Sequence, residues 1–257
     1  MKLSIGINIF NQNERQNIAV ECLKRLKQKN SNIEVYNISY KDELQEVSEF
    51  KSLPILGESS STLTGNEMVK KPIANEFFNI LSNTECDYFL FLNSDIILSQ
   101  KALNLIFAGN MESYIFSRHE IKPITSLEDK IIPYKIEVAG FDAWAVKKAW
   151  WIENGNTIPK CIYSEVAWDN IMSLSLFTKS NAKFCNKEFY IGHLSHPINW
   201  SRETPEGMYN MKTWNSMAIA PKWDYYMQAF LFRRSPRGQY LNPIDNEETM
   251  EKSILTI

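Results

Sequence analysis

The sequence predicts an α/β fold in which a mixed, mostly parallel central sheet is flanked by helices. Segments with the alternation of a strand are followed by segments with helical spacing through the first hundred residues, as in βαβ units. The most apolar run, Tyr-Phe-Leu-Phe-Leu at positions 88–92, is short and lies between polar turns. Such a run is typical of a central strand that is covered on both faces.

The composition excludes several classes of protein. The 28 Lys and Arg residues nearly balance the 30 Asp and Glu residues, so binding of nucleic acid by bulk electrostatics is not expected. A hydrophobic content of 44% excludes a disordered chain. No apolar run approaches the ~18 residues of a membrane span. No signal peptide is recognised and the four cysteines are widely scattered, which together predict a cytoplasmic protein with reduced thiols.

The elements expected in the first half follow one another closely. A strand over 3–10 leads to a helix capped by Asn13, because an Asn side chain can accept from the first free backbone N–H groups. A second strand is expected over 33–39, a short helix over 41–50, a loop over 51–64 and a helix over 66–81. The buried strand over 88–92 completes this half.

The second half is less regular. Strands are expected over 112–119, 135–146 and 183–191, and a helix over 164–177. From residue 199 the sequence is aromatic and partly basic, and irregular helices with a frayed end after residue 242 are expected there. We therefore expect one domain over 1–198, with its halves at about 1–100 and 101–198, and a helical, aromatic C-terminal extension over 199–257.

The strongest local feature is Asn93-Ser94-Asp95, directly after the buried strand. Ligands of open α/β sheets bind outside the carboxyl ends of the strands. A carboxylate there can hold Mg²⁺ or Mn²⁺, since hard cations favour oxygen ligands and substrate phosphates. The alternative is a simple turn, with Ser99 capping the next helix.

Two of the three histidines, His193 and His196, directly follow the expected strand over 183–191. An imidazole from this position could join Asp95 around a metal ion. The alternative is a pair of loop histidines that form ordinary hydrogen bonds.

Two carboxylates, Glu165 and Asp169, are spaced four residues apart within the predicted helix over 164–177. Residues at this spacing share one helix face. Mutual repulsion would raise one pKa and produce a plausible general base. The alternative is a solvated acidic first turn that the helix dipole stabilises.

The order of these features resembles the GT-A type nucleotide-sugar glycosyltransferases, most closely their family 2. Residues 4–11, Ser-Ile-Gly-Ile-Asn-Ile-Phe-Asn, are similar to the family's first strand and its Pro-x-Tyr-Asn turn. Residues 72–75, Pro-Ile-Ala-Asn, lie where the family has Ala-Arg-Asn, and residues 87–95 match the strand that ends in Asp-x-Asp. Residues 140–144 are similar to the acceptor-side strand. His193 matches the histidine that completes the metal site in many members.

The resemblance implies a GT-A-like, Rossmann-like catalytic domain with a nucleotide-binding first half and an acceptor-binding second half. It implies Asp169 and Glu165 as catalytic residues, Asp142 and Trp144 as acceptor-binding residues, and a Mn²⁺ or Mg²⁺ ion on Asp95, His193 and His196. The residues implied for binding the nucleotide sugar are Asn8, Phe10, Asn11, Asp42, Lys71, Asn75, Asn93, Ser94 and Asp95.

The function implied is transfer of a sugar from a UDP- or GDP-sugar to a saccharide or lipid-linked acceptor, with inversion, in surface polysaccharide or glycoconjugate synthesis. A departure from the family pattern is Asn93, which replaces the first Asp of Asp-x-Asp. The loss of this charge keeps open an inactive nucleotide- or sugar-binding module. A sugar nucleotidyltransferase is the other alternative, although the turn after the first strand lacks a Gly-rich phosphate loop.

The aromatic segment over 223–234 has two interpretations. As an amphipathic segment it would lie on the inner face of the membrane, where lipid-linked acceptors are found. The alternatives are packing on the domain or a contact between subunits of a homo-oligomer.

Overall fold

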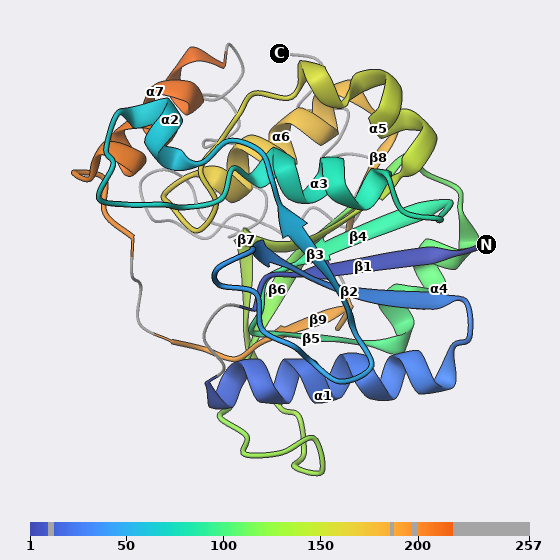
Figure 1. The fold of residues 1–257 in the computed structure, drawn as a ribbon. Coiled ribbons are helices and arrows are strands. Elements are labelled where there is room, and N and C mark those ends of the chain that lie inside the picture. The colour runs from blue at the N-terminus through green and yellow to red at the C-terminus, as the bar shows by residue number, and fades with distance from the viewer. Residues whose placement is uncertain (10–12, 186–187, 197–199, 218–257) are drawn as a thin grey trace, which may run out of the picture.

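The computed structural model describes residues 1–9, 13–185, 188–196 and 200–217, and these form a central sheet between two layers of helices (Figure 1). Helices α3 (Ala74–Ser82), α5 (Lys148–Asn154) and α6 (Trp168–Lys179) cover one face. Helices α1 (Glu14–Lys29) and α4 (Gln100–Ala108) cover the other. The predicted α/β architecture is confirmed. No helix within the described part of the chain is long and apolar enough to cross a membrane.

One half of the sheet is parallel. Its strands are β1 (Leu3–Ile7), β2 (Ile33–Tyr40), β3 (Lys51–Ile55) and β4 (Tyr88–Leu92), in the spatial order β3-β2-β1-β4. Helix α1 connects β1 to β2, and the Asn13 side chain accepts a hydrogen bond from the Gln16 backbone N–H at its start. The strands expected around 3–10, 33–39 and 88–92 and the helix capped by Asn13 are confirmed.

The other half makes the sheet mixed. Strand β7 (Pro133–Lys147) runs antiparallel to β4, and β6 (Ser113–Ile121) runs antiparallel to β7. Both β8 (Ala182–Cys185) and β9 (Ile191–His193) pair with β6 in parallel, at different points along it. The short strand β5 (Ile96–Leu98) then pairs antiparallel with β9. The turn after β4 is thereby brought beside the end of β9.

Two predictions for the first half were wrong. Residues 41–50 form turns and irregular structure rather than a helix, and the Asn37 side chain, which projects from β2, donates to the Gln45 carbonyl and holds this segment. The predicted loop over 51–64 contains β3 and the short helix α2 (Ser60–Thr64). Strand β3 forms because its backbone extends the parallel sheet beyond β2.

Helix α3 begins later than predicted, at Ala74 rather than near residue 66. Pro72 and Ile73 are held extended by isolated bridges to Ser59 and Ile162, respectively. A proline also lacks the N–H that a helix interior needs.

The second half also differs from the prediction. The helix expected over 164–177 begins at Trp168, because Ser164 and Ala167 adopt left-handed backbone angles with φ of 61° and 63°. The strand expected over 183–191 is split into β8 and β9. The C-terminal extension starts with helix α7 (Pro205–Ser216), and the aromatic segment over 223–234 lies outside the described residues.

Strand β4 anchors both layers of the core. All five of its residues are buried, with Phe89 and Phe91 facing the α3 side and Leu90 and Leu92 facing the α1 side. The Phe91 ring stacks on that of Phe77 from α3, with ring centroids 4.4 Å apart. Close packing on both faces fixes the position at which β4 ends. The polar residues that follow it therefore start from a rigid support.

Candidate active site

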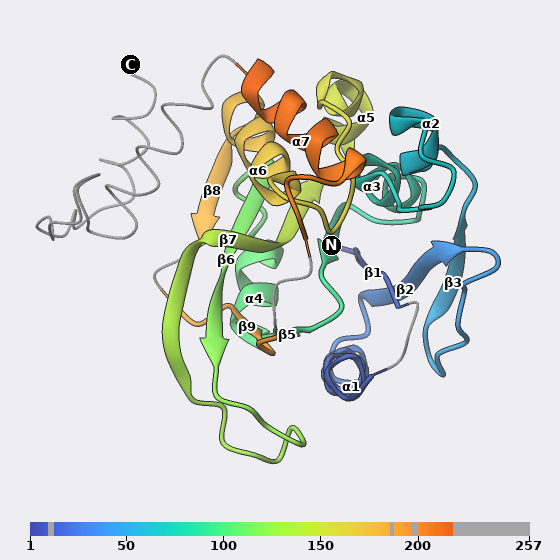
Figure 2. The same ribbon diagram turned by 90° about the vertical axis from the view of Figure 1, so that its left-hand side faces the viewer.

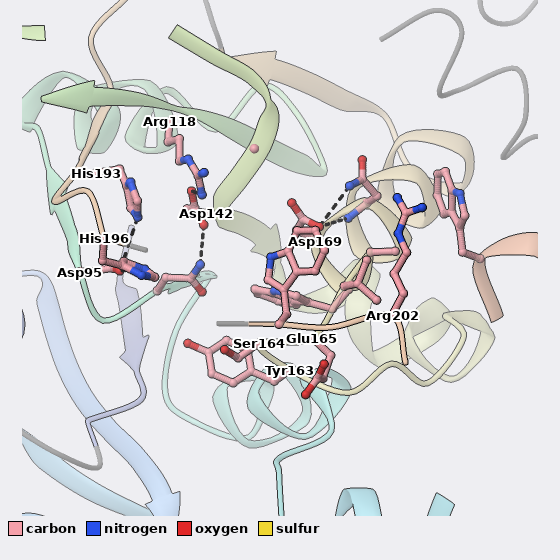
Figure 3. Close-up of a pocket in the computed structure, with 18 of the residues that line it drawn as sticks. Asp95, Arg118, Asp142, Tyr163, Ser164, Glu165, Asp169, His193, His196 and Arg202 are labelled. Carbon is pink, nitrogen blue, oxygen red and sulfur yellow. Dashed lines mark hydrogen bonds and ion pairs between the residues drawn. The ribbon is translucent and has the colours of Figure 1, made fainter. Parts of the chain in front are cut away.

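A cavity of about 430 Å³ lies where the chain leaves β4 (Figure 3). Its walls come from segments that are far apart in the sequence, namely the turn after β4, strands β6 and β7, residues 163–170, the end of β9 and helix α7. The side chains that line it include four carboxylates, two histidines and two arginines. The cavity is thus lined by more titratable side chains than a packing defect would be.

The structure brings together Asp95, His193 and His196, the three residues that the sequence suggested as metal ligands. One potential ligand atom from each lies within 4.8 Å of the others. Asp95 Oδ2 is 3.0 Å from His196 Nε2 and 3.5 Å from His193 Nε2. The pairing of β5 with β9 produces this contact, because Ile96 is in register with His193.

A residue that the sequence did not single out orients His193. Glu120 on β6 is buried, and its Oε2 lies 2.9 Å from His193 Nδ1. The same carboxylate accepts a hydrogen bond from the Ser195 hydroxyl. With Nδ1 held in this way, Nε2 of His193 is directed toward Asp95. Carboxylate support of the second ring nitrogen is the usual arrangement for a histidine that ligates a metal.

The contacts within this cluster stabilise the ionised forms of its side chains. Burial raises the pKa of Asp95, but hydrogen bonds from His193 and His196 outweigh it and hold the pKa below its usual range. Burial also opposes the charge on Glu120, yet contacts with His193 and Ser195 lower its pKa to about 2. Burial lowers the pKa of His193, and its bonds to Asp95 and Glu120 raise it to about 9. The cluster thus favours a positive charge between these carboxylates.

The donor set suits a divalent ion. One carboxylate oxygen and two imidazole nitrogens lie close enough together to share one ion, and the imidazoles fit Mn²⁺ better than Mg²⁺, which prefers oxygen ligands throughout.

A second polar group surrounds Asp142, at the middle of β7. The Asn93 amide donates to its Oδ1, and Arg118 Nη1 lies 3.1 Å from its Oδ2. Arg118 also pairs with Glu120, at 2.9 Å. It therefore links the carboxylate that supports His193 to the carboxylate that holds Asn93.

The remaining carboxylate of interest, Asp169, lies at the start of α6 and is partly buried in the cavity wall. Burial and the negative charge of Asp142 raise the pKa of Asp169 to about 6. Its protonation therefore changes close to neutral pH.

The predicted pairing of Glu165 with Asp169 on one helix face was wrong. Glu165 precedes α6, in the turn that the left-handed Ser164 and Ala167 create. It is buried, forms an ion pair with Lys71 and lines the cavity. The carboxylate that perturbs Asp169 is Asp142.

Trp144 does not reach the cavity, contrary to its predicted contact with an acceptor. The residue is fully buried in the core, where its indole N–H donates to the Ser173 hydroxyl at 2.9 Å. Its ring centroid lies 4.9 Å from that of Trp168. A sugar has no access to its ring faces.

The other predicted nucleotide-binding residues lie elsewhere. Asn8 is buried and donates to the Ile38 carbonyl, while Asn75 is buried and donates to the Ile158 carbonyl. Asp42 is exposed and pairs with Lys70, and Ser94 accepts from the Gln16 amide. None of these four is among the described residues that line the cavity. Phe10 and Asn11 lie outside the described residues.

Several cavity residues were missed in the sequence. Arg118 and Tyr163 belong to no recognisable motif. The pairing of β6 with β7 brings Arg118 to the site, whereas Tyr163 is held there by its backbone N–H, which donates to the Pro72 carbonyl at 2.9 Å. Trp200 and Arg202 also line the cavity. The aromatic and basic composition after residue 199 was a signal for them, although it did not indicate which residues face the site.

Structural comparison finds known proteins with a similar fold. No protein-family model and no curated protein matches the sequence. Staphylococcus aureus TarS superposes over 99% of this chain and 42% of its own, with a TM-score of 0.50 and 12% identity. The chain therefore shares its overall fold with TarS.

Two further structures are similar at lower scores. A TarS fragment, residues 1–349, matches 75% of this chain with a TM-score of 0.48 and 13% identity, and the chain spans 60% of that fragment. A glycosyltransferase involved in glycosylation of the PBCV-1 major capsid matches 82% of this chain and 100% of its own, with a TM-score of 0.42 and 12% identity. Identities this low relate the folds alone.

Proposed function

We propose that the protein is a metal-dependent, inverting glycosyltransferase that moves a sugar from a nucleoside-diphosphate sugar to a saccharide or lipid-linked acceptor. The observation that carries this proposal is the convergence of Asp95, His193 and His196 in the cavity that also contains Asp169. The resemblance of the sequence motifs to GT-A glycosyltransferases adds a further part to the proposal. The protein would act in the synthesis of surface polysaccharide or glycoconjugates, on the cytoplasmic side of the membrane.

The donor end of the cavity would be formed by Asp95, His193 and His196, which would hold Mn²⁺. A divalent ion there neutralises the charge that develops on a departing nucleoside diphosphate. Asn93 supplies a further contact. Its amide nitrogen is fixed by Asp142, while its Oδ1 is buried without a protein partner in the described residues. That oxygen is suited to accept a hydrogen bond from a hydroxyl of the donor.

The acceptor end would be formed around Asp169. A base with a pKa of about 6 is deprotonated at neutral pH and retains affinity for a proton. In Figure 3, Asp169 lies across the cavity from Asp95, His193 and His196. The acceptor hydroxyl would be deprotonated on one side of the cavity, and the charge of the departing diphosphate would be neutralised on the other. This arrangement favours in-line displacement, which inverts the anomeric centre.

The proposal is tested by titrating UDP and GDP into the protein by calorimetry, with and without Mn²⁺. UDP is the first choice because TarS has been solved with UDP and with UDP-GlcNAc. We expect Mn²⁺ to tighten binding of one nucleotide at least tenfold, and Asp95→Ala or His193→Ala to abolish this effect. Asp87→Ala is the matched control, because Asp87 is an exposed aspartate at the opposite end of β4.

The products decide the class of reaction. Release of nucleoside diphosphate from a nucleotide sugar supports glycosyl transfer, whereas release of pyrophosphate indicates nucleotidyl transfer. Nucleotide binding that is independent of Mn²⁺, with no turnover of any nucleotide sugar, would contradict the proposal and favour a binding module.

A further inference from the structure

One edge of the cavity is formed by Trp200 and Arg202, which belong to the segment that leads into α7. The two residues are separated by one position in a stretch without helical structure, and both line the cavity. Trp200 retains 43% of its surface exposed, which is unusual for so large an apolar side chain. We call this pair the acceptor rim.

The acceptor rim is built on a rigid base. Thr204 caps α7 by accepting a hydrogen bond from the Gly207 N–H at 3.0 Å, and its own hydroxyl donates to the Ser201 carbonyl. A Cβ atom at Gly207 would lie only 2.0 Å from that carbonyl oxygen. Glycine permits this approach, and the hydrogen bond from Thr204 fixes the Ser201 backbone against the start of the helix. Trp200 and Arg202 flank this fixed point.

Helix α7 is in turn fixed to the cavity wall. The buried Asn210 side chain accepts from the Ile162 N–H at 2.8 Å and donates to the Ile162 carbonyl at 2.9 Å. The buried Glu206 accepts from the Asn66 amide at 3.0 Å. The bonds of Asn210 connect α7, and the acceptor rim before it, to the segment that continues into the 163–170 wall and Asp169.

Arg202 differs from Arg118, the other arginine that lines the cavity, and from Lys71, which contacts the lining residue Glu165. Arg118 is paired with Asp142 and Glu120, and Lys71 is paired with Glu165. Arg202, by contrast, forms no ion pair with any described residue. An exposed guanidinium that faces a cavity and has no carboxylate partner is suited to a carboxylate or phosphate of a ligand.

The position of Arg202 indicates which ligand it serves. In Figure 3, Asp169 lies between Arg202 and the cluster of Asp95, His193 and His196. The diphosphate of a donor belongs near that cluster, whereas Arg202 lies on the side from which a hydroxyl would approach Asp169. An indole ring beside it offers a flat apolar surface for the face of a sugar.

We propose that the acceptor is an anionic saccharide whose ring packs on Trp200 and whose carboxylate or phosphate binds Arg202. This inference rests on the proposed function and specifies its acceptor class. The charge lies on the acceptor unit itself, within reach of the hydroxyl that Asp169 would deprotonate. A neutral glycan would leave the guanidinium without a partner inside the site.

The test measures binding of three matched probes by saturation-transfer NMR, in the presence of UDP or GDP and Mn²⁺. The probes are methyl β-glucoside, methyl β-glucuronide and methyl β-glucoside 6-phosphate. We expect the wild-type protein to bind at least one anionic probe about tenfold more tightly than the neutral one. Arg202→Ala should remove this difference, Arg202→Lys should retain part of it, and Trp200→Ala should weaken all three probes.

Arg25→Ala is the control for removal of an arginine, since Arg25 lies on α1 and pairs with Glu21 and Glu128. Equal binding of the three probes by the wild-type protein would overturn the inference. So would an Arg202→Ala variant that loses nucleotide affinity instead of anionic-probe affinity, because Arg202 would then serve the donor.

The probe that binds best separates carboxylate from phosphate recognition. Failure of the proposed function would be recognised by a different result, namely that the wild-type protein shows no Mn²⁺-dependent nucleotide binding. Intact nucleotide binding without a preference for an anionic probe overturns the inference alone.

Discussion

The chemistry of single residues in this cavity depends on neighbours from other strands. Asp169 follows Glu165 closely in the sequence, yet the charge that raises its pKa is that of Asp142 on β7. Arg118 limits this effect, because it pairs with Asp142 and its charge favours the ionised form of Asp169. The result is a carboxylate that titrates near pH 6, in the range a general base requires.

Asp169→Asn should lower the transfer rate 10²- to 10⁴-fold while nucleotide affinity stays within threefold of wild type. In the wild-type protein the proposed transfer rate should rise with pH to a plateau, with its acid limb near pH 6, because Asp169 would act as a base only when deprotonated. Initial rates between pH 5 and 8, together with nucleotide titrations, check both expectations. A rate within tenfold of wild type would exclude Asp169 as the base.

The same substitution should affect stability in the opposite direction. A folded-state pKa above the unfolded value means that the folded protein binds the proton more tightly, so the carboxylate destabilises the fold as pH rises from about 4 to 6. Asp169→Asn removes this penalty and should stabilise the protein by about 1–2 kcal/mol at pH 8, since a partly buried group retains some solvation. Urea denaturation at pH 8 measures it, with Asp87→Asn as the control.

At the scale of the elements, the reliable predictions came from hydrophobic patterning. Strands β1, β2 and β4 were located because runs of apolar and β-branched residues mark buried strands. The start of α6 was not located correctly. The left-handed turn before it is formed by Ser164 and Ala167 rather than by the glycines that usually indicate such turns. The prediction thereby placed Glu165 on the helix, although it precedes α6, and so paired Asp169 with the wrong carboxylate.

Ala167→Gly should therefore stabilise the protein. The left-handed conformation costs an alanine roughly 1 kcal/mol that a glycine does not incur, so we expect a gain of about 0.5–1 kcal/mol in the free energy of unfolding. Ala102→Gly is the contrasting variant, since Ala102 lies inside α4 and glycine there should destabilise by about 1 kcal/mol or more. Denaturant titration of both variants provides the measurement. A loss of stability in Ala167→Gly would contradict the assigned backbone strain.

At the scale of the whole molecule, the sequence disclosed the residues proposed to hold a metal but not their surroundings. Asp, His and His after strand ends formed a recognisable pattern, and the pairing of β5 with β9 brought them together. Glu120 and Arg118 carried no such signal. They reach the site because β6 lies between β7 and β9, an order that depends on contacts between distant parts of the chain. Sheet order of this kind leaves no local trace in a sequence.

One long-range contact that fixes a wall of the cavity is that of Asn210 with Ile162. Asn210→Ala would leave the buried N–H and carbonyl of Ile162 without partners, at about 1–3 kcal/mol each. We expect a loss of about 2–4 kcal/mol in the free energy of unfolding, measured by urea denaturation. Asn104→Ala, at an exposed position of α4, should change it by less than 0.5 kcal/mol.

Hydrogen exchange locates the effect of Asn210→Ala. Because Asn210 fastens α7 to the strand-like segment before Tyr163, amides of α7 should exchange faster in the variant while those of β1 and β4 change only with global stability. The acceptor rim directly precedes α7. We therefore expect the Asn210→Ala variant also to bind the anionic probes more weakly. Unchanged exchange in α7, or a stability within 0.5 kcal/mol of wild type, would contradict the view that the Asn210 side chain fastens α7 to the cavity wall.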